Sequence, residues 1–262
     1  MKKIKTIVVG CGDRACVYAE EGVFGLNRLE IVGAVDPDEV RLKYMQEHFG
    51  VKAECCYTDQ SQLLAKGKVA DCIINGTMDQ YHKETSIPFL KQGYDMLLEK
   101  PIVNNEKDLM EIRDAARENG CKLMICHVLR FSPFYRKIKE LILAGEIGDI
   151  VSIETGERVG YAHSSMSYIR GKWNKESECG SSLLLAKCCH DMDLLCWLNN
   201  KTVPVEVSSF GGRDFMTAEN APKGAGTRCL VDCPKDVREH CIFDVQAMYL
   251  DIIFSMSHGK IS

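Results

Sequence analysis

The 262-residue sequence has no long apolar run, no strong excess of charge of either sign, no internal repeat and no low-complexity tract. A membrane-spanning helix needs about 18 consecutive apolar residues, and no stretch reaches that length. The net charge of −4 gives no electrostatic basis for binding nucleic acid or an anionic membrane. The basic N-terminus is followed by an apolar run too short for a signal peptide. We therefore expect a cytoplasmic protein with neither a nucleic-acid nor a membrane partner.

Cysteine is abundant, with 14 residues. In a long cytosolic chain most of them should be reduced thiols that are buried as small apolar groups. One cluster raises an alternative, because Cys229, Cys233, His240 and Cys241 could together bind structural zinc. The spacing is not that of paired zinc knuckles, and adjacent His240 and Cys241 are awkward as simultaneous ligands. We therefore predict no metal site.

Strand-like and helix-like segments alternate through the first half of the chain. The predicted strands are 5–9, 30–35, 70–75, 95–98 and 122–126, and the predicted helices are 15–21, 40–49, 62–65, 80–91 and 107–118. This alternation favours an α/β fold with a doubly wound parallel sheet that is covered on both faces. We place this first domain at residues 1–127.

The second half, residues 128–262, follows a different pattern. It predicts a helix at 133–145, strands at 150–158 and 203–210, a loop at 161–179, a helix at 183–197 and a helical segment at 242–254. Two strands alone would leave long unpaired edges. Further strands within 211–262, a covering second chain or a truncated sequence would each explain this. We favour truncation of an α+β domain with an open, mainly antiparallel sheet.

The segment VVGCGDRA places Gly10 and Gly12 after a strand and before a helix, with Ala15 in the third small position. This is the dinucleotide-binding turn, in which a pyrophosphate lies against the helix N-terminus. Asp36 ends the second strand, 24 residues after Gly12, where a carboxylate accepts hydrogen bonds from ribose hydroxyls. It would repel a 2′-phosphate, so the sequence favours NAD over NADP. The expected cofactor residues of this part are Gly10, Cys11, Gly12, Asp13, Arg14 and Asp36.

Four further motifs follow in order, namely GTMDQYH at 76–82, LLEKPI at 97–102, HVLRFSPFY at 127–135 and CHDMDLLCWL at 189–198. With these motifs, residues 4–210 resemble the Gfo/Idh/MocA family of oxidoreductases. The resemblance implies a Rossmann domain followed by an open antiparallel sheet, a homo-oligomer formed through that sheet, and relatives of well over 300 residues. It adds Gly76, Thr77, His82, Glu99 and Lys100 to the cofactor site and identifies His190 as the active-site histidine.

Hydride transfer from a secondary alcohol needs a base for the hydroxyl proton, while the cofactor supplies the redox chemistry. Lys100 follows a predicted parallel strand, at the edge where open α/β sheets place ligands. We expect Lys100 to be the acid/base, with His190 hydrogen-bonding the substrate hydroxyl and relaying its proton.

The sequence departs from the family pattern four residues before His190, where Ala186 stands in place of an aspartate. We hypothesise that Lys187 takes over a role in substrate binding or in lowering the basicity of Lys100, with Asp191 or Asp193 balancing its charge. The loop 161–179 adds polar and aromatic groups suited to a polyhydroxylated ring. The expected substrate residues are Lys187, Asp191, Tyr161, His163, Arg170 and Trp173.

The sequence thus predicts an NAD-dependent dehydrogenase that acts on a sugar, a cyclic polyol or a sugar derivative. Two alternatives stay open. One is a glycoside hydrolase that oxidises and re-reduces its substrate with bound NAD, and the other is a non-catalytic NAD-binding remnant.

Overall fold

The computed structural model describes residues 2–251. The chain divides into two compact units. The first consists of Met1–Thr155 together with Lys175–Asn200, and the second consists of Gly156–Asn174 and the chain from Lys201 onward. Each unit is described by itself.

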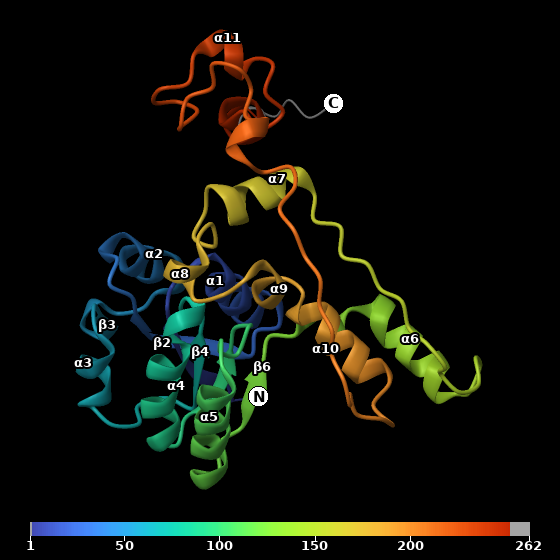
Figure 1. Cartoon of the computed structure of the whole chain (residues 1–262). Coiled ribbons are helices and arrows are strands. Elements are labelled where there is room, and N and C mark those ends of the chain that lie inside the picture. Colours follow the sequence, from blue (N-terminus) through green and yellow to red (C-terminus); the bar gives the residue numbers. More distant parts are fainter. Residues whose placement is uncertain (1, 252–262) are drawn as a thin grey trace. The chain divides into compact units, whose positions relative to one another are not determined.

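A six-stranded parallel sheet forms the centre of the first unit (Figure 1). Its strands are β1 (Ile4–Val9), β2 (Leu29–Val35), β3 (Cys56–Tyr57), β4 (Cys72–Asn75), β5 (Asp95–Leu98) and β6 (Leu123–Ile125). Their order is β3-β2-β1-β4-β5-β6, the doubly wound Rossmann order, so the direction of winding reverses between β1 and β4. The predicted parallel sheet is confirmed. Strand β3 was not predicted.

Helices cover both faces of this sheet, as predicted. They are α1 (Asp13–Glu20), α2 (Glu39–Phe49), α3 (Gln60–Leu64), α4 (His82–Lys91) and α5 (Glu106–Glu118). Because side chains alternate along a strand, β1 sends Val8 into one core with α1 and α2, and Ile7 and Val9 into the other with α3, α4 and α5. Asp38 and Asn105 cap α2 and α5 by accepting hydrogen bonds from backbone N–H groups of the first turns.

Four further helices complete the first unit, namely α6 (Pro133–Leu143), α8 (Glu176–Cys179), α9 (Leu183–Ala186) and α10 (Cys189–Leu198). A short 3₁₀ helix, η4 (Val128–Phe131), precedes α6. The ammonium group of Lys139 on α6 donates hydrogen bonds to the backbone carbonyls of Trp197 and Leu198 and to the Asn200 side chain. Lys139 thereby ties α6 to the C-terminal end of α10.

The continuous helix predicted for 183–197 is wrong, because a break at Lys187–Cys188 separates α9 from α10. In a continuous helix the Ala186 carbonyl would accept a hydrogen bond from the amide of His190. Here it accepts one from the ammonium group of Lys100 at 3.1 Å, and the His190 amide bonds instead to the Lys187 carbonyl.

The predicted strands at 150–158 and 203–210 are also wrong, since neither segment pairs with another strand within residues 2–251. Their alternating pattern is typical of half-buried strands, but a strand forms only where a partner supplies ladder hydrogen bonds. The side chains of Val151, Val205 and Phe210 are each 96% exposed. The predicted antiparallel sheet is therefore not formed in the described part of the chain.

The second unit contains only short helices within its described residues. They are α7 (Tyr161–Ser164), η5 (Ser165–Ile169), η6 (Ala218–Asn220), α11 (Lys235–Arg238) and η7 (Gln246–Leu250). The loop predicted for 161–179 is thus largely helical, because local i→i−4 and i→i−5 hydrogen bonds pair its backbone N–H and C=O groups. The helix predicted for 242–254 is reduced to η7, and residues 252–254 lie outside the described residues. The hydroxyl of Tyr249 donates to the carbonyl of Ala162 at 2.6 Å, linking the two segments of this unit.

No helix between residues 2 and 251 combines the length and apolar character needed to cross a membrane.

Candidate active site

The turn after β1 has the geometry that a dinucleotide requires. Gly10 has a φ of +76°, and a Cβ atom there would lie 2.6 Å from the backbone nitrogen of Thr77, so only glycine fits. Gly12 has an ordinary φ of −78° and an added Cβ would meet nothing within 4 Å. No neighbouring protein atom therefore requires glycine at position 12. The open backbone at the N-terminus of α1 leaves room for a pyrophosphate to approach, so the residues present fit the expected cofactor.

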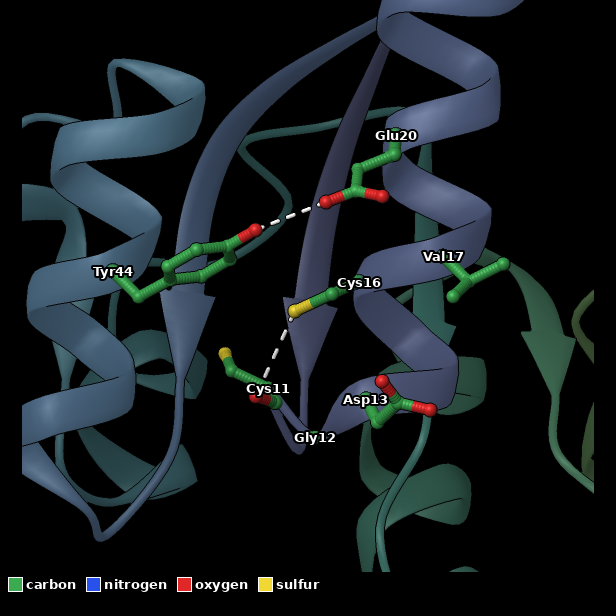
Figure 2. A pocket seen from close by; sticks show the side chains of 7 residues that line it. All are labelled: Cys11, Gly12, Asp13, Cys16, Val17, Glu20 and Tyr44. Carbon is green, nitrogen blue, oxygen red and sulfur yellow. Dashed lines mark hydrogen bonds between the residues drawn. The ribbon is translucent and has the colours of Figure 1, made fainter. Parts of the chain in front are cut away.

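A cavity of about 230 Å³ lies beside this turn, between α1 and α2 (Figure 2). The residues that line it are Cys11, Gly12, Asp13, Cys16, Val17, Glu20 and Tyr44. A hydrogen bond of 2.9 Å from the Tyr44 hydroxyl to Glu20 closes one side. Burial raises the pKa of the Cys16 thiol to about 11 and also raises that of Cys11, so both are neutral groups.

Asp36 is buried at the end of β2 and organises the same turn. Its carboxylate accepts hydrogen bonds from the backbone amides of Cys11 at 2.8 Å and Asp38 at 2.9 Å. The guanidinium group of Arg41 lies 3.3 Å from it. Asp36 therefore holds the turn in place, in addition to its predicted role towards the ribose.

The segment after β4 packs directly on this turn. A Cβ atom on Gly76 would lie 2.6 Å from the Cβ of Ala15, and the Thr77 hydroxyl donates to the side chain of Asn75 at 2.9 Å. His82 is fully buried, with Nδ1 2.8 Å from the Pro101 carbonyl and Nε2 3.0 Å from the Thr77 carbonyl. It thus fastens the 76–82 segment to the loop that carries Lys100.

Glu99 is buried against α1. Its carboxylate accepts a hydrogen bond of 2.6 Å from the hydroxyl of Tyr18, and the side chain of Arg14 lies 3.9 Å away. Burial and the neighbouring Glu99 raise the pKa of Tyr18, so its hydroxyl stays protonated and donates the hydrogen bond to Glu99. These contacts fix the start of the Lys100 loop next to the helix that begins at the dinucleotide turn.

The amine of Lys100 points towards α9 and α10. It donates to the Ala186 carbonyl, in the gap between those helices. Lys187 follows, and its charge acts on His190 in the first turn of α10. Burial, together with Lys100, His127 and Lys187, lowers the pKa of His190 to about 4, against the opposing effect of Asp193. The buried Nδ1 atom of His190 has no hydrogen-bond partner among the described residues.

A cluster that we did not predict adjoins His190. The carboxylate of Asp193 accepts hydrogen bonds from Arg130 Nε at 2.6 Å and Nη2 at 2.5 Å, and its Oδ1 atom lies 2.8 Å from His127 Nδ1. The rings of His127 and His190 lie 6.2 Å apart between centroids. The oxygens of Asp193 are engaged by Arg130 and His127, and the expectation that Asp191 or Asp193 balances the charge of Lys187 stays a prediction. The i, i+3 spacing of His190 and Asp193 was the available sequence signal.

The other expected substrate residues are distributed between the two units. Asp191 follows His190 in the first turn of α10. Tyr161, His163, Arg170 and Trp173 belong to the second unit, where Arg170 donates to the carbonyl of Phe243. Their role towards the substrate stays a prediction.

The cysteine cluster forms no metal-binding group of three or more ligands within the described residues. The Cys229 thiol lies instead 3.5 Å from the guanidinium group of Arg170. None of the 14 cysteines, all of which lie within residues 2–251, forms a disulfide.

Comparison with known proteins gives matches over most of the chain. "Putative oxidoreductase YteT" of Bacillus subtilis (strain 168) is 28% identical over 188 residues, which are 71% of this chain and 43% of that protein. The "2,7-anhydro-N-acetylneuraminate hydratase" of Escherichia coli (strain K12) is 26% identical over 194 residues, 73% of this chain and 50% of that protein. The chain thus spans about half the length of these curated relatives.

The fold has counterparts among solved structures. The scyllo-inositol dehydrogenase of Lactobacillus casei with bound NAD(H) and scyllo-inositol matches with a TM-score of 0.65 and 21% sequence identity, covering 76% of this chain and 57% of that one. Residues 4–127 match the model of an oxidoreductase family with an NAD-binding Rossmann fold, and residues 135–233 match the model of the GFO/IDH/MocA C-terminal domain. The chain therefore belongs to the Gfo/Idh/MocA family of oxidoreductases.

Proposed function

We propose that this chain transfers a hydride between NAD and a secondary hydroxyl of a sugar, a cyclic polyol or a sugar derivative, with Lys100 as the acid/base. The observation that carries this proposal is the position of Lys100. It follows β5 at the carboxyl edge of the sheet, its loop is fastened to α1 by Glu99, and its amine donates to Ala186 at the end of α9, four residues before His190.

These contacts suggest a separate role for each group. Bound NAD supplies the hydride chemistry. The turn at Gly10 and Gly12 holds the pyrophosphate, and Asp36 fixes the turn and faces the ribose. Lys100 takes the hydroxyl proton during oxidation and returns it during reduction. The names of relatives agree with such a substrate, since one structural neighbour binds scyllo-inositol.

The test is an NADH-absorbance screen of the purified protein with NAD and a panel of inositols, hexoses and sugar acids. We expect NADH to form with one of these classes. Replacement of Lys100 with Met should lower kcat by about 10²- to 10⁴-fold and change the affinity for NADH much less, because the turn at Gly10 and Gly12 that holds the pyrophosphate stays intact. A Lys100→Met protein with full turnover would exclude Lys100 as the acid/base.

A second candidate is transient oxidation without net NADH formation. It is favoured by the Escherichia coli relative, whose name describes the addition of water and not a net oxidation. Release of an aglycone or a hydrated product at constant NADH absorbance, with a requirement for NAD, would identify this reaction. A protein that binds NADH and turns over nothing would be the non-catalytic remnant.

We further propose that residues 1–127 bind NAD, that residues 128–262 contribute to substrate binding, and that the chain forms a homo-oligomer. Light scattering of the purified protein measures the oligomeric state directly.

A further inference from the structure

The cluster of Asp193, His127 and Arg130 resembles a carboxylate–imidazole pair built for proton handling. Asp193 is 6% exposed and His127 is 20% exposed in their side chains. Two hydrogen bonds from Arg130 fix the orientation of the Asp193 carboxylate, which in turn fixes the imidazole ring of His127. The pair joins two elements that are distant in sequence, η4 and α10.

The contact determines which nitrogen of His127 carries the proton. A carboxylate 2.8 Å from Nδ1 accepts a hydrogen bond, so Nδ1 is protonated and Nε2 presents its lone pair. The structure shows no hydrogen-bond partner for Nε2 within residues 2–251. Burial, Arg130 and Lys100 lower the pKa of His127 below its usual 6.5, against the opposing effect of Asp193. The ring is therefore neutral at neutral pH and ready to accept a proton.

The neighbouring groups have no such carboxylate partner. Lys100 donates to the Ala186 carbonyl, which is a backbone oxygen and does not accept a proton at neutral pH. Burial, Lys100, His127 and Lys187 lower the pKa of His190, and its buried Nδ1 atom has no hydrogen-bond partner among residues 2–251. His127 differs from His190 because the carboxylate of Asp193 directly stabilises the imidazolium ion that forms when Nε2 is protonated.

We propose that His127, oriented by Asp193 and Arg130, is the proton-relay residue that accepts the substrate proton from Lys100. This inference rests on the function proposed above. Bound NAD would supply the acceptor for the carbinol hydride. During oxidation the hydroxyl proton goes to Lys100, and Lys100 passes a proton on to His127 Nε2, from which it reaches solvent. During reduction the same proton moves in the opposite direction.

The first test uses a substrate found in the NADH screen and measures kcat/KM against pH. In His127→Asn we expect kcat to fall at least tenfold, KM to change little, and the acidic limb of the profile to disappear. Asp193→Asn should lower kcat similarly, because an amide no longer favours the Nδ1–H tautomer. Free imidazole should restore part of the activity of His127→Ala, whereas a merely structural defect would not respond. His48→Gln, at a histidine on α2 that pairs with Glu20, is the matched control and should behave as wild type.

The second test needs no substrate. Nitrogen-15 NMR of the histidine side chains distinguishes the two tautomers, and it also reports whether the variants are folded. We expect the Nδ1–H form for His127 in the wild type and its loss in Asp193→Asn. An Nε2–H tautomer in the wild type, or turnover by folded His127→Asn with an unchanged pH profile, would overturn this inference alone. Absence of turnover by the wild type with every compound would instead refute the proposed function.

Discussion

A substitution at Lys139 would measure how much this residue stabilises the packing of α10, the helix that carries His190. Its side chain is 7% exposed, and its ammonium group bonds to the carbonyls of Trp197 and Leu198 and to Asn200. The Lys139→Met substitution keeps most of the aliphatic stem and removes every donor. The Asn200 side chain can turn to solvent, but the two helix-terminal carbonyls lose a partner. An unsatisfied buried acceptor costs about 1–3 kcal/mol, so the free energy of unfolding should fall by about 2–4 kcal/mol.

Urea unfolding followed by tryptophan fluorescence is the assay, since Trp197 contributes one of the two carbonyls. For an m-value of about 2 kcal/mol/M, the midpoint should fall by about 1–2 M urea. Lys137→Met is the matched control, because Lys137 lies on the same helix, is 67% exposed and pairs with the exposed Glu140. Its midpoint should move by less than about 0.3 M, as expected for a surface ion pair. Equal midpoints for the two variants would refute the view that Lys139 anchors α10.

Three further outcomes follow from the cofactor turn and from His190. Gly10→Ala should destabilise the protein by about 3 kcal/mol in urea unfolding, because the added Cβ meets Thr77 at 2.6 Å and φ is +76°. Gly12→Ala should change stability by no more than about 0.5 kcal/mol but weaken NADH binding at least tenfold in a fluorescence titration; unchanged affinity would argue against a pyrophosphate there. The pKa of His190 is lower in the folded state than the value of 6.5 in the unfolded state, so its contribution to stability is present above pH 6.5 and is lost as pH drops towards 4. The free energy of unfolding should fall by about 1–2 kcal/mol over that range, after allowance for partial exposure. His190→Asn should flatten this pH dependence.

The Rossmann part was predictable because each of its signals is local. Apolar strands, glycine stops and helix caps are read within a few residues, and the parallel alternation then fixes the architecture. Strand β3 was missed because Cys56 and Tyr57 are too short a segment to show a pattern. The strands expected at 150–158 and 203–210 failed for the opposite reason, since the pattern is present but the pairing partner is not.

The candidate site was predictable only in part. Lys100 and His190 belong to motifs, and the structure places them near each other. The break between α9 and α10 occurs where the Ala186 carbonyl accepts a long-range hydrogen bond from Lys100, and no local sequence pattern predicts that bond. The contact of His127 with Asp193 joins positions 66 residues apart and was equally invisible.

The discontinuous make-up of the first unit has a practical consequence. Residues 175–200 return to the Rossmann part through Asn104, which donates to the Gly180 carbonyl at 3.0 Å, and through Lys100 at Ala186. A polypeptide ending at residue 127 would keep both glycines and Asp36 but lose His190 and Asp193. The first unit is therefore assembled from two separate stretches of sequence, and a synthetic peptide spanning 175–200, added in trans, is a natural candidate for restoring His190 and Asp193 to a chain that ends at residue 127.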